Sequence, residues 1–373
     1  MVGLYIHIPF CKQKCLYCDF ASFANIDNLM EGYVDALVKE INDKSKNQII
    51  KSLFIGGGTP SHLNNTSLKK LMDCLNELNY VEGAEKTIEC NPGTLTKEKL
   101  LIIKDGGINR LSFGLQSADD VMLKRIGRIH TYKEFEENYL LARSLGFNNI
   151  NIDMMFGLPN QKVDDIKKSF DKVLSLNPDH ISAYSLIIEE GTPFYEMYNK
   201  ELIILPSEDD ERLMYYTAKK MLIEHGFHQY EISNYAKEDK ECYHNKLYWK
   251  CEDYLGVGIA ASSFINNTRK KNISNIREYI NRIHNNQCII EDEYVNTIND
   301  NIEEFMFMNL RMVEGLSEEE FERRFNKNID DVYSKVIKKH IENGLLVRKE
   351  GRIFLSNKGM ELSNYVMSDM ILD

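Results

Sequence analysis

The chain has 373 residues, of which 43% are hydrophobic and 28% are charged. This length exceeds that of one ordinary compact domain and indicates either one large α/β barrel with an appendage or two to three smaller domains. The composition excludes a disordered, collagen-like or coiled-coil chain. The formal net charge of −11 argues against a main role in binding phosphate backbones or anionic lipid surfaces, so small molecules and proteins are the expected partners.

No run of residues approaches the roughly 20 consecutive apolar residues that span a bilayer. Residues 1–10 have no cationic region before their apolar residues, and we therefore expect a cytoplasmic protein. Its eight cysteines would then be reduced. Only Cys11, Cys15 and Cys18 are clustered, which indicates metal binding or reactivity. The others are interpreted as ordinary thiols: Cys74, Cys90, Cys242, Cys251 and Cys288.

Short β-branched or apolar runs alternate with amphipathic helix patterns through the first two thirds of the chain. Predicted strands cover residues 4–8, 53–56, 87–90, 110–113, 151–155 and 181–186, and predicted helices cover 30–44, 67–78, 132–145 and 163–176. This order predicts an α/β fold with a parallel sheet and right-handed crossovers. Polar residues fall at the C-terminal strand ends, where barrel loops converge on one site. We therefore predict a partial (β/α)6 barrel of the TIM type over residues 1–235.

The alternation stops after about residue 235. Residues 236–290 are interpreted as a connecting region that closes over the barrel. From about residue 291 a helical pattern leads to a predicted hairpin at residues 344–348 and 352–355, which suggests a small winged-helix-like α+β domain over residues 291–373. This last segment has 11 Lys and Arg against 18 Asp and Glu, so we expect packing or partner docking and no nucleic-acid binding.

Cys11, Cys15 and Cys18 have a C-x3-C-x2-C spacing just after a predicted strand. Three thiolates can hold one soft metal centre, whereas structural zinc needs a fourth ligand and ferredoxin-type clusters use four thiolates. A [4Fe–4S] cluster held by three would leave one iron open to a substrate or cofactor. The spacing alone leaves two alternatives, which are a zinc site completed by a residue such as His7 and a chance group of reduced thiols.

The surroundings of this triplet resemble the radical S-adenosylmethionine superfamily. Residues 8–10 (IPF) precede Cys11, and residues 56–60 (GGGTP) follow the second predicted strand. The glycine run lacks the Lys-Ser/Thr of a phosphate loop, so binding of a nucleotide triphosphate is not expected. The resemblance implies that the three cysteines hold a [4Fe–4S] cluster, that S-adenosylmethionine chelates its fourth iron, and that Gly57, Gly58 and Thr59 lie at the methionyl amino group.

S-adenosylmethionine carries an amine, a carboxylate, a sulfonium and two ribose hydroxyls, and therefore needs both acidic acceptors and a cationic or amide donor. Glu89, Gln116, Arg128 and Asp153 supply such a set, although each alone would more often be a surface or helix-capping residue. Their motifs, at residues 89–92 (ECNP), 115–117 (LQS), 127–130 (GRIH) and 151–153 (NID), resemble the porphyrin-related branch of the superfamily. The same resemblance implies that Tyr5 and Tyr17 flank the cofactor and that Ile187 contacts its adenine.

Two related families share this resemblance over essentially the whole chain: oxygen-independent coproporphyrinogen III oxidases and the HemW-type haem chaperones. The oxidase pattern has a fourth cysteine two residues after the third, where this chain has Phe20. The oxidases also carry an N-terminal extension, for which ten residues ahead of the cluster leave no room. Residues 244–249 (HNKLYW) are similar to the H-N-x-x-Y-W motif of the chaperones. The chaperone family is therefore favoured.

His244 is the predicted haem-binding residue, because imidazole is a common axial ligand of haem iron and aromatic rings pack against porphyrins. The alternative is that His244 hydrogen-bonds a loop while Tyr248 and Trp249 fill a seam.

The expected cofactors are a [4Fe–4S] cluster and S-adenosylmethionine, with haem as bound cargo. The expected partners are acceptor haemoproteins, including respiratory and membrane-associated ones, and a second copy of the chain. Radical decarboxylation of a porphyrinogen propionate and DNA-binding regulation are the alternative functions.

Overall fold

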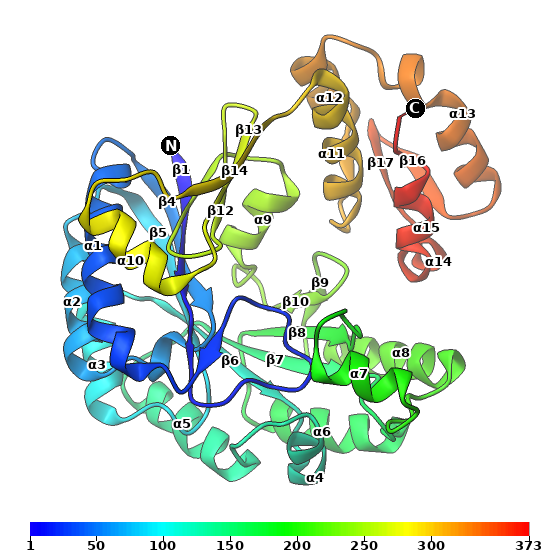
Figure 1. Ribbon diagram of the computed structural model, residues 1–373. Coiled ribbons are helices and arrows are strands. Elements are labelled where there is room, and N and C mark those ends of the chain that lie inside the picture. Colours follow the sequence, from blue (N-terminus) through cyan, green and yellow to red (C-terminus); the bar gives the residue numbers. More distant parts are fainter. Residues whose placement is uncertain (373) are drawn as a thin grey trace.

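The computed structural model describes residues 1–372, and its centre is a curved parallel sheet (Figure 1). Six strands follow one another in the order β1-β4-β5-β6-β7-β8, each parallel to its neighbour. The predicted partial (β/α)6 barrel is thereby confirmed. The six strands are β1 (Val2–Ile8), β4 (Ile50–Gly57), β5 (Tyr80–Cys90), β6 (Arg110–Gln116), β7 (Ile150–Phe156) and β8 (His180–Ser185).

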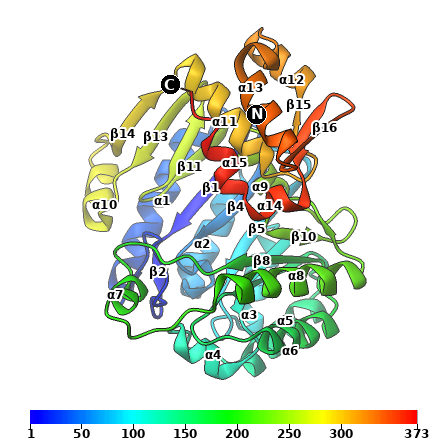
Figure 2. The ribbon, with the colours of Figure 1, turned by 90° about the vertical axis from the view of Figure 1, so that its right-hand side faces the viewer.

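Helices cover the outer face of these strands (Figures 1 and 2). Local sequence fixes several of their starts, since Asn64 caps α2 and Thr131 forms a capping box with Glu134 at α5. The four predicted helices are confirmed to within two residues, and four others were not predicted. The helices are α1 (Met30–Ser45), α2 (Asn65–Asn76), α3 (Lys97–Asp105), α4 (Asp120–Arg125), α5 (Tyr132–Ser144), α6 (Val163–Ser175), α7 (Pro193–Asn199) and α8 (Glu208–Glu224).

The two faces of the barrel strands differ in chemistry. Aliphatic residues such as Leu53, Ile55 and Leu111 are fully buried in one large core together with the helices. The alternate positions, such as Ser52 and Ser112, face the barrel axis and are largely polar. Barrel interiors are usually filled by branched aliphatic side chains. A polar interior therefore marks this barrel as the place of a binding site.

The sheet continues past both edges of the barrel. Strand β11 (Tyr254–Val257) pairs in parallel with β1 and is followed by the antiparallel strands β12 (Ser262–Ile265), β13 (Thr268–Asn272) and β14 (Ile290–Val295). At the other edge, β10 (Asn234–Ala236) pairs with β8 and with β9 (His228–Gln229). The residues after 235, expected only to connect and close, therefore also build sheet, and α10 (Ile276–His284) packs beside α1.

Helix α9 (Tyr243–Trp249) lies at the N-terminal end of the barrel strands, because His244 contacts Ser52 near the start of β4. The cysteine loop lies at the opposite end, where Gly58 N donates to Ile8 O. At ~3.3 Å per residue, the five residues from Ser52 to Gly57 separate the two ends by about 17 Å. The connecting region thus closes the barrel at the end away from the cysteines.

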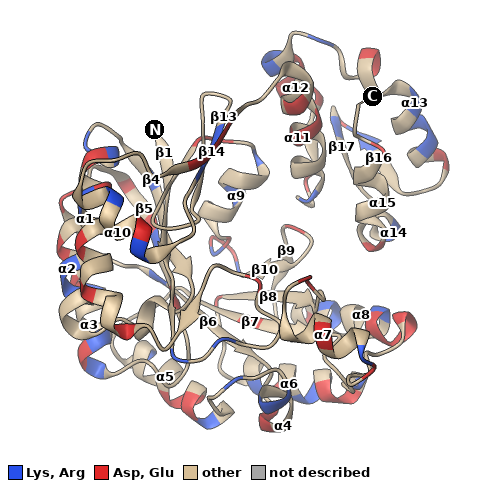
Figure 3. Cartoon of the chain, viewed as in Figure 1, with Lys and Arg blue, Asp and Glu red and all other residues tan. Residues whose placement is uncertain are grey.

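The C-terminal segment has its own hydrophobic core, which includes Phe305, Phe321 and Ile337. It consists of three longer helices, two short ones and a three-stranded sheet in the order β15-β17-β16, and the predicted hairpin is confirmed. Helices α11 and α12 carry many acidic residues (Figure 3). The domain boundaries at residues 235 and 290 stay a prediction. The elements are α11 (Ile298–Leu310), β15 (Leu316–Ser317), α12 (Glu318–Phe325), α13 (Ile329–Glu342), β16 (Leu346–Lys349), β17 (Arg352–Leu355), α14 (Asn357–Glu361) and α15 (Ser363–Ser368).

Within the described residues, none of the helices is both long enough and apolar enough to cross a membrane.

Candidate functional site

The three clustered cysteines lie in one loop that starts at the short strand β2 (Phe10–Cys11) and returns at β3 (Phe23–Ala24). Cys11 is buried, whereas Cys15 and Cys18 are partly exposed. Burial raises the pKa of the Cys11 and Cys18 thiols. An electropositive metal centre would offset this penalty by binding them as thiolates.

The zinc alternative proposed a histidine such as His7 as the fourth ligand, and the structure engages the His7 ring elsewhere. One ring nitrogen of His7 contacts the Ala21 carbonyl at 2.9 Å and the other contacts the Tyr5 hydroxyl at 3.0 Å. Among residues 1–372, no three His, Cys, Asp or Glu side chains lie close enough together to bind a single metal ion. The chain therefore offers three thiols without a histidine partner.

The glycine-rich end of β4 packs tightly against the cysteine loop. Gly57 has a φ of +109°, and a Cβ there would lie 2.5 Å from the His7 ring. A Cβ on Gly58 would lie 2.9 Å from the carbonyl oxygens of Ile8 and Phe10 and 3.0 Å from Cys11 Sγ. Only glycine permits this approach, because any side chain would push the loop away. Thr59 completes the contact by donating to Cys11 Sγ at 3.6 Å.

Two carboxylates, Glu89 and Asp153, project into the barrel beside this strand end. Both line one cavity. Glu89 accepts a hydrogen bond from Gly57 N at 3.1 Å, and burial together with the charge of Asp153 raises its pKa to about 8. Asp153 accepts from Asn151 Nδ2 at 2.7 Å, and burial raises its pKa as well. Two buried acids that are incompletely neutralised form a place for a cationic ligand.

Arg128 supplies a cation at the same strand ends. It donates to Asn91 Oδ1 at 2.5 Å, and Asn91 Nδ2 donates to Thr59 Oγ1 at 2.8 Å, so a chain of polar contacts joins Arg128 to the cysteine loop. The Arg128 Nε is buried without a hydrogen-bond partner among the described residues. A buried cation with a free donor matches the carboxylate of an amino-acid moiety.

Gln116 lies on an irregular part of β6 with a left-handed backbone, at a φ of +72°. This conformation is costly for a residue other than glycine and commonly marks a functional site. Its side-chain oxygen accepts from Tyr184 at 2.9 Å, which fixes the amide near Arg128 and Asp153.

The remaining residues predicted to contact the cofactor are Tyr5, Tyr17 and Ile187, and they differ in where they lie. Tyr5 lines the same cavity as Glu89 and Asp153. Tyr17 lies beside Arg128 and Cys15 and packs on Phe194, with ring centroids 6.5 Å apart. Ile187, just after β8, is 67% exposed. An exposed aliphatic side chain at the strand ends is available to cover a bound ligand.

The structure brings Tyr5, Gly57, Glu89 and Asp153 to one cavity, whereas Thr59 and Arg128 line another hollow together with Cys15. The barrel cavity has a volume of about 280 Å³ and opens near Phe20, which is 62% exposed. This set of groups fits S-adenosylmethionine, because the acids would face its cationic groups, the arginine would face its carboxylate and the three thiols would hold a [4Fe–4S] cluster.

His244 is separated from this site. It is 1% exposed, and its ring nitrogens contact Ser52 Oγ and the Tyr248 hydroxyl, each at 2.8 Å. It also stacks on Phe54 with centroids 5.4 Å apart, and burial lowers its pKa to about 3. In this arrangement neither ring nitrogen is free to bind iron. The alternative interpretation, in which His244 bonds within the fold, describes the observed geometry.

Trp249, at the end of α9, faces the C-terminal segment. The Arg311 guanidinium lies 4.4 Å from its ring, and Arg311 is in turn 3.9 Å from the buried Glu231. The Trp249 Nε1 is buried without a partner among the described residues. Trp249, the last residue of the HNKLYW motif, therefore lies at the junction between the barrel and the C-terminal segment.

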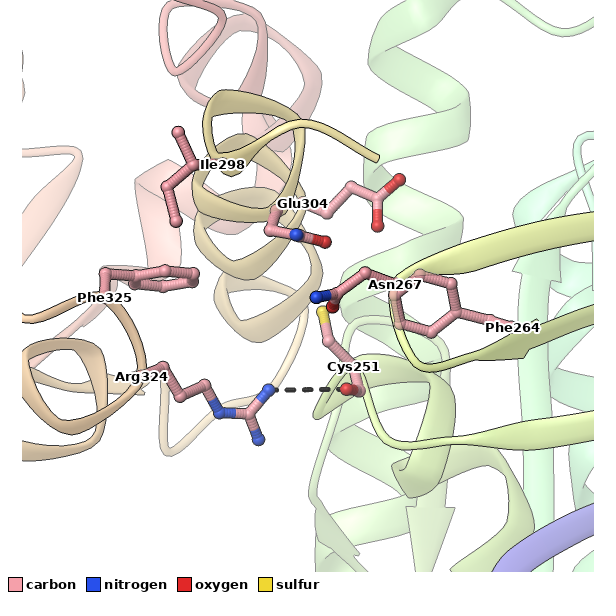
Figure 4. A pocket seen from close by; sticks show the side chains of 8 residues that line it. Cys251, Phe264, Asn267, Ile298, Glu304, Arg324 and Phe325 are labelled. Atoms are coloured by element: carbon pink, nitrogen blue, oxygen red, sulfur yellow. Dashed lines mark hydrogen bonds between the residues drawn. The ribbon is translucent and has the colours of Figure 1, made fainter. Parts of the chain in front are cut away.

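A second hollow, of about 200 Å³, lies at the same junction (Figure 4). Arg324 of α12 donates to the Cys251 carbonyl at 3.3 Å across it. Above it, Glu304 of α11 accepts two hydrogen bonds from Arg269 of β13, at 2.9 and 2.6 Å. These charged contacts hold the C-terminal segment against the extended sheet.

Sequence reasoning missed the polar residues at the floor of the barrel. Arg110, Ser112, His180 and Cys242 line the same cavity as Glu89 but lie toward α9. Glu85, also missed, accepts from the backbone N–H groups of Tyr243 and His244 and so holds the start of α9. The available signal was the alternation of polar residues along β5 and β6, which no predicted motif included.

Comparison with known proteins gives consistent matches along the chain. The Radical SAM superfamily model matches residues 5–173, and the HemN C-terminal domain model matches residues 297–362. The chain is 39% identical to a heme chaperone HemW of Bacillus subtilis, with 98% of each chain covered. It is 35% identical to the heme chaperone HemW of Lactococcus lactis, with 99% of this chain and 97% of the relative covered.

Among solved structures, coproporphyrinogen III oxidase (HemN) from Escherichia coli superposes with a TM-score of 0.86. The match covers 99% of this chain and 90% of the other at 23% identity, and therefore shows a shared fold.

Proposed function

Since this chain belongs to the HemW family of the radical SAM superfamily, we propose that it is a haem chaperone, which binds haem and transfers it to acceptor haemoproteins. The observation that carries this proposal is the 39% identity to a heme chaperone over 98% of the chain. The HNKLYW motif and Phe20, which the sequence analysis interpreted as favouring the chaperones, support it.

Under the proposal, Cys11, Cys15 and Cys18 hold a [4Fe–4S] cluster. When bound, the cluster and S-adenosylmethionine supply one-electron chemistry. Glu89 and Asp153 pair with the cationic groups of S-adenosylmethionine. The other polar contacts come from Gly57, Gly58, Thr59, Gln116 and Arg128, and the apolar cover from Tyr5, Tyr17 and Ile187.

Haem binding through His244 requires a rearrangement of α9. Because Ser52 and Tyr248 occupy both ring nitrogens, one hydrogen bond must break before iron can bind. The helix has seven residues, and the junction contact of Trp249 with Arg311 lies at its far end. The proposal therefore couples haem binding by His244 to a change in the surroundings of Trp249.

Haem titration of the anaerobically reconstituted protein tests this function. The Soret absorbance reports haem binding, the fluorescence of the single Trp249 reports the helix, and a parallel assay measures decarboxylation of coproporphyrinogen III. We expect saturable haem binding, altered Trp249 emission and no decarboxylation. Decarboxylation without stable haem binding would instead support the oxidase function.

Two variants locate the haem. His244→Ala should lose the axial contact and lower haem affinity. Ser52→Ala removes one hydrogen bond that holds His244 in the interior, and such a bond contributes about 1 kcal/mol. The Ser52→Ala protein should therefore bind haem about fivefold more tightly than the wild type. Equal haem affinity in all three proteins would exclude His244 as the ligand and leave the family assignment intact. Dimer formation and membrane-associated acceptors stay predictions.

A further inference from the structure

A buried arginine lies at the floor of the barrel cavity. Arg110 begins β6, is 1% exposed and lines the cavity together with Ser112, the next residue on the same strand face. Its Nε has no hydrogen-bond partner among residues 1–372. A buried guanidinium N–H without a hydrogen bond is costly, and native proteins rarely leave one unsatisfied. The position therefore needs an explanation.

The nearest acid, Glu85, forms an ion pair with Arg110 but does not accept a hydrogen bond from it. Glu85 Oε2 lies 3.7 Å from the Arg110 Nε, beyond hydrogen-bond distance. The Glu85 carboxylate instead accepts from the N–H groups of Tyr243 and His244, at 3.1 and 3.0 Å, and from the Cys242 thiol at 3.5 Å. Glu85 therefore balances part of the Arg110 charge, while its oxygens accept hydrogen bonds from the start of α9. The Arg110 Nε–H therefore has no acceptor among the described residues.

The remaining walls of the floor are neutral and polar. Ser112 and Ser182 face each other across Asn151, which accepts from Ser182 at 3.2 Å and donates to Ser112 at 2.8 Å. Asn245 of α9 also lines the cavity. Burial lowers the pKa of the nearby His180 well below its usual value, so this imidazole stays neutral. Arg110 is the one cation among the residues that line the cavity.

We propose that Arg110, with Ser112 and Asn245, binds the carboxylate of a small monocarboxylic acid at the floor of the barrel. The planar guanidinium presents paired N–H donors that match two carboxylate oxygens. A single negative charge matches the single cation among the lining residues, whereas a doubly charged phosphate would leave an excess of negative charge in a cavity that Glu89 and Asp153 also line. The cavity of about 280 Å³ admits a molecule of a few carbon atoms and excludes a tetrapyrrole. The site lies in the cavity that Glu89 and Asp153 also line, at the end toward α9 and away from the cysteine loop.

Titration with sodium propionate tests the site on the full chain without haem or cluster. Binding is measured by isothermal calorimetry and by the midpoint of thermal unfolding, at constant ionic strength, with sodium chloride and inorganic phosphate as the comparison salts. We expect a saturable response to propionate and none to chloride or phosphate. Arg110→Gln should weaken propionate binding at least tenfold.

Two further variants keep the test decisive if the Arg110→Gln protein fails to fold. Arg110→Lys keeps the charge without the paired donors, and Ser112→Ala removes one neutral donor. Both should fold and bind propionate several-fold more weakly than the wild type. Absence of saturable propionate binding by the wild type would overturn the proposal, as would equal binding by wild type, Arg110→Lys and Ser112→Ala.

Discussion

Glu89 offers a test of the cofactor site through its pKa. Burial in the barrel, with the charge of Asp153 adding to it, raises this pKa to about 8 from an ordinary value near 4.5. A cationic ligand binds the ionised carboxylate, so its affinity must follow the ionised fraction. That fraction is about 3% at pH 6.5 and about 75% at pH 8.5 for a pKa of 8. Affinity for S-adenosylmethionine should therefore rise about 25-fold over this range.

The matched control is Glu89→Gln, which keeps the shape of the side chain and removes its titration. Equilibrium binding of S-adenosylmethionine is measured from pH 6.5 to 8.5 on the wild type and on Glu89→Gln, both anaerobically reconstituted. Titration of the ligand itself affects both proteins equally, so the difference between the two profiles isolates Glu89. Parallel profiles for wild type and Glu89→Gln would refute the placement of Glu89 at a cationic group.

The same residue has a consequence for stability. A raised pKa in the folded state means that the folded protein binds the proton more tightly than the unfolded chain does. The stability contributed by protonated Glu89 is thus complete below pH 4.5 and is lost as the pH rises toward 8, by about 1.4 kcal/mol per pH unit. In urea denaturation of the cofactor-free protein, Glu89→Gln should gain stability relative to the wild type between pH 5.5 and 7.5.

Four other substitutions address the cysteine loop and the junction between the barrel and the C-terminal segment. Cys15→Ser should abolish the retention of iron and sulfide after reconstitution. The control Cys288→Ser changes an exposed thiol outside the cysteine loop and should retain both. Equal loss of iron in the two variants would contradict the cluster assignment. Gly58→Ala places a Cβ 3.0 Å from Cys11 Sγ and should also impair cluster retention while leaving far-UV circular dichroism unchanged; normal iron content would refute this packing argument. Arg311→Ala removes the guanidinium over Trp249 and should shift its emission to longer wavelength, with a loss of about 1 kcal/mol in unfolding free energy; unchanged emission would contradict the junction contact.

The barrel could be predicted because its signals are local. Each strand is a short apolar run, and residues such as Asn64 and Thr131 mark helix starts in the sequence itself. The cysteine spacing and the glycine run predict the cofactor end in the same way, since those residues lie within single loops.

The floor of the barrel could not be predicted in this way. The contact of His244 with Ser52 joins residues 192 positions apart, and the pairing of β11 with β1 depends on similarly distant partners. The motif at residues 244–249 indicated suitable haem chemistry, but tertiary packing decides whether the imidazole is free. The sequence predicts Arg110 only as the start of a strand, because the unsatisfied Nε becomes visible only when Glu85 and α9 are in place.

Haem transfer is the most direct test of the central claim. The haem-loaded, reconstituted protein is mixed with an excess of an acceptor apo-haemoprotein, and the two haem spectra are followed with and without S-adenosylmethionine. The account predicts that haem moves to the acceptor, that the rate exceeds that of free haem release, and that Cys15→Ser changes this rate. Retention of haem, or transfer no faster than passive release in every case, would contradict a chaperone function.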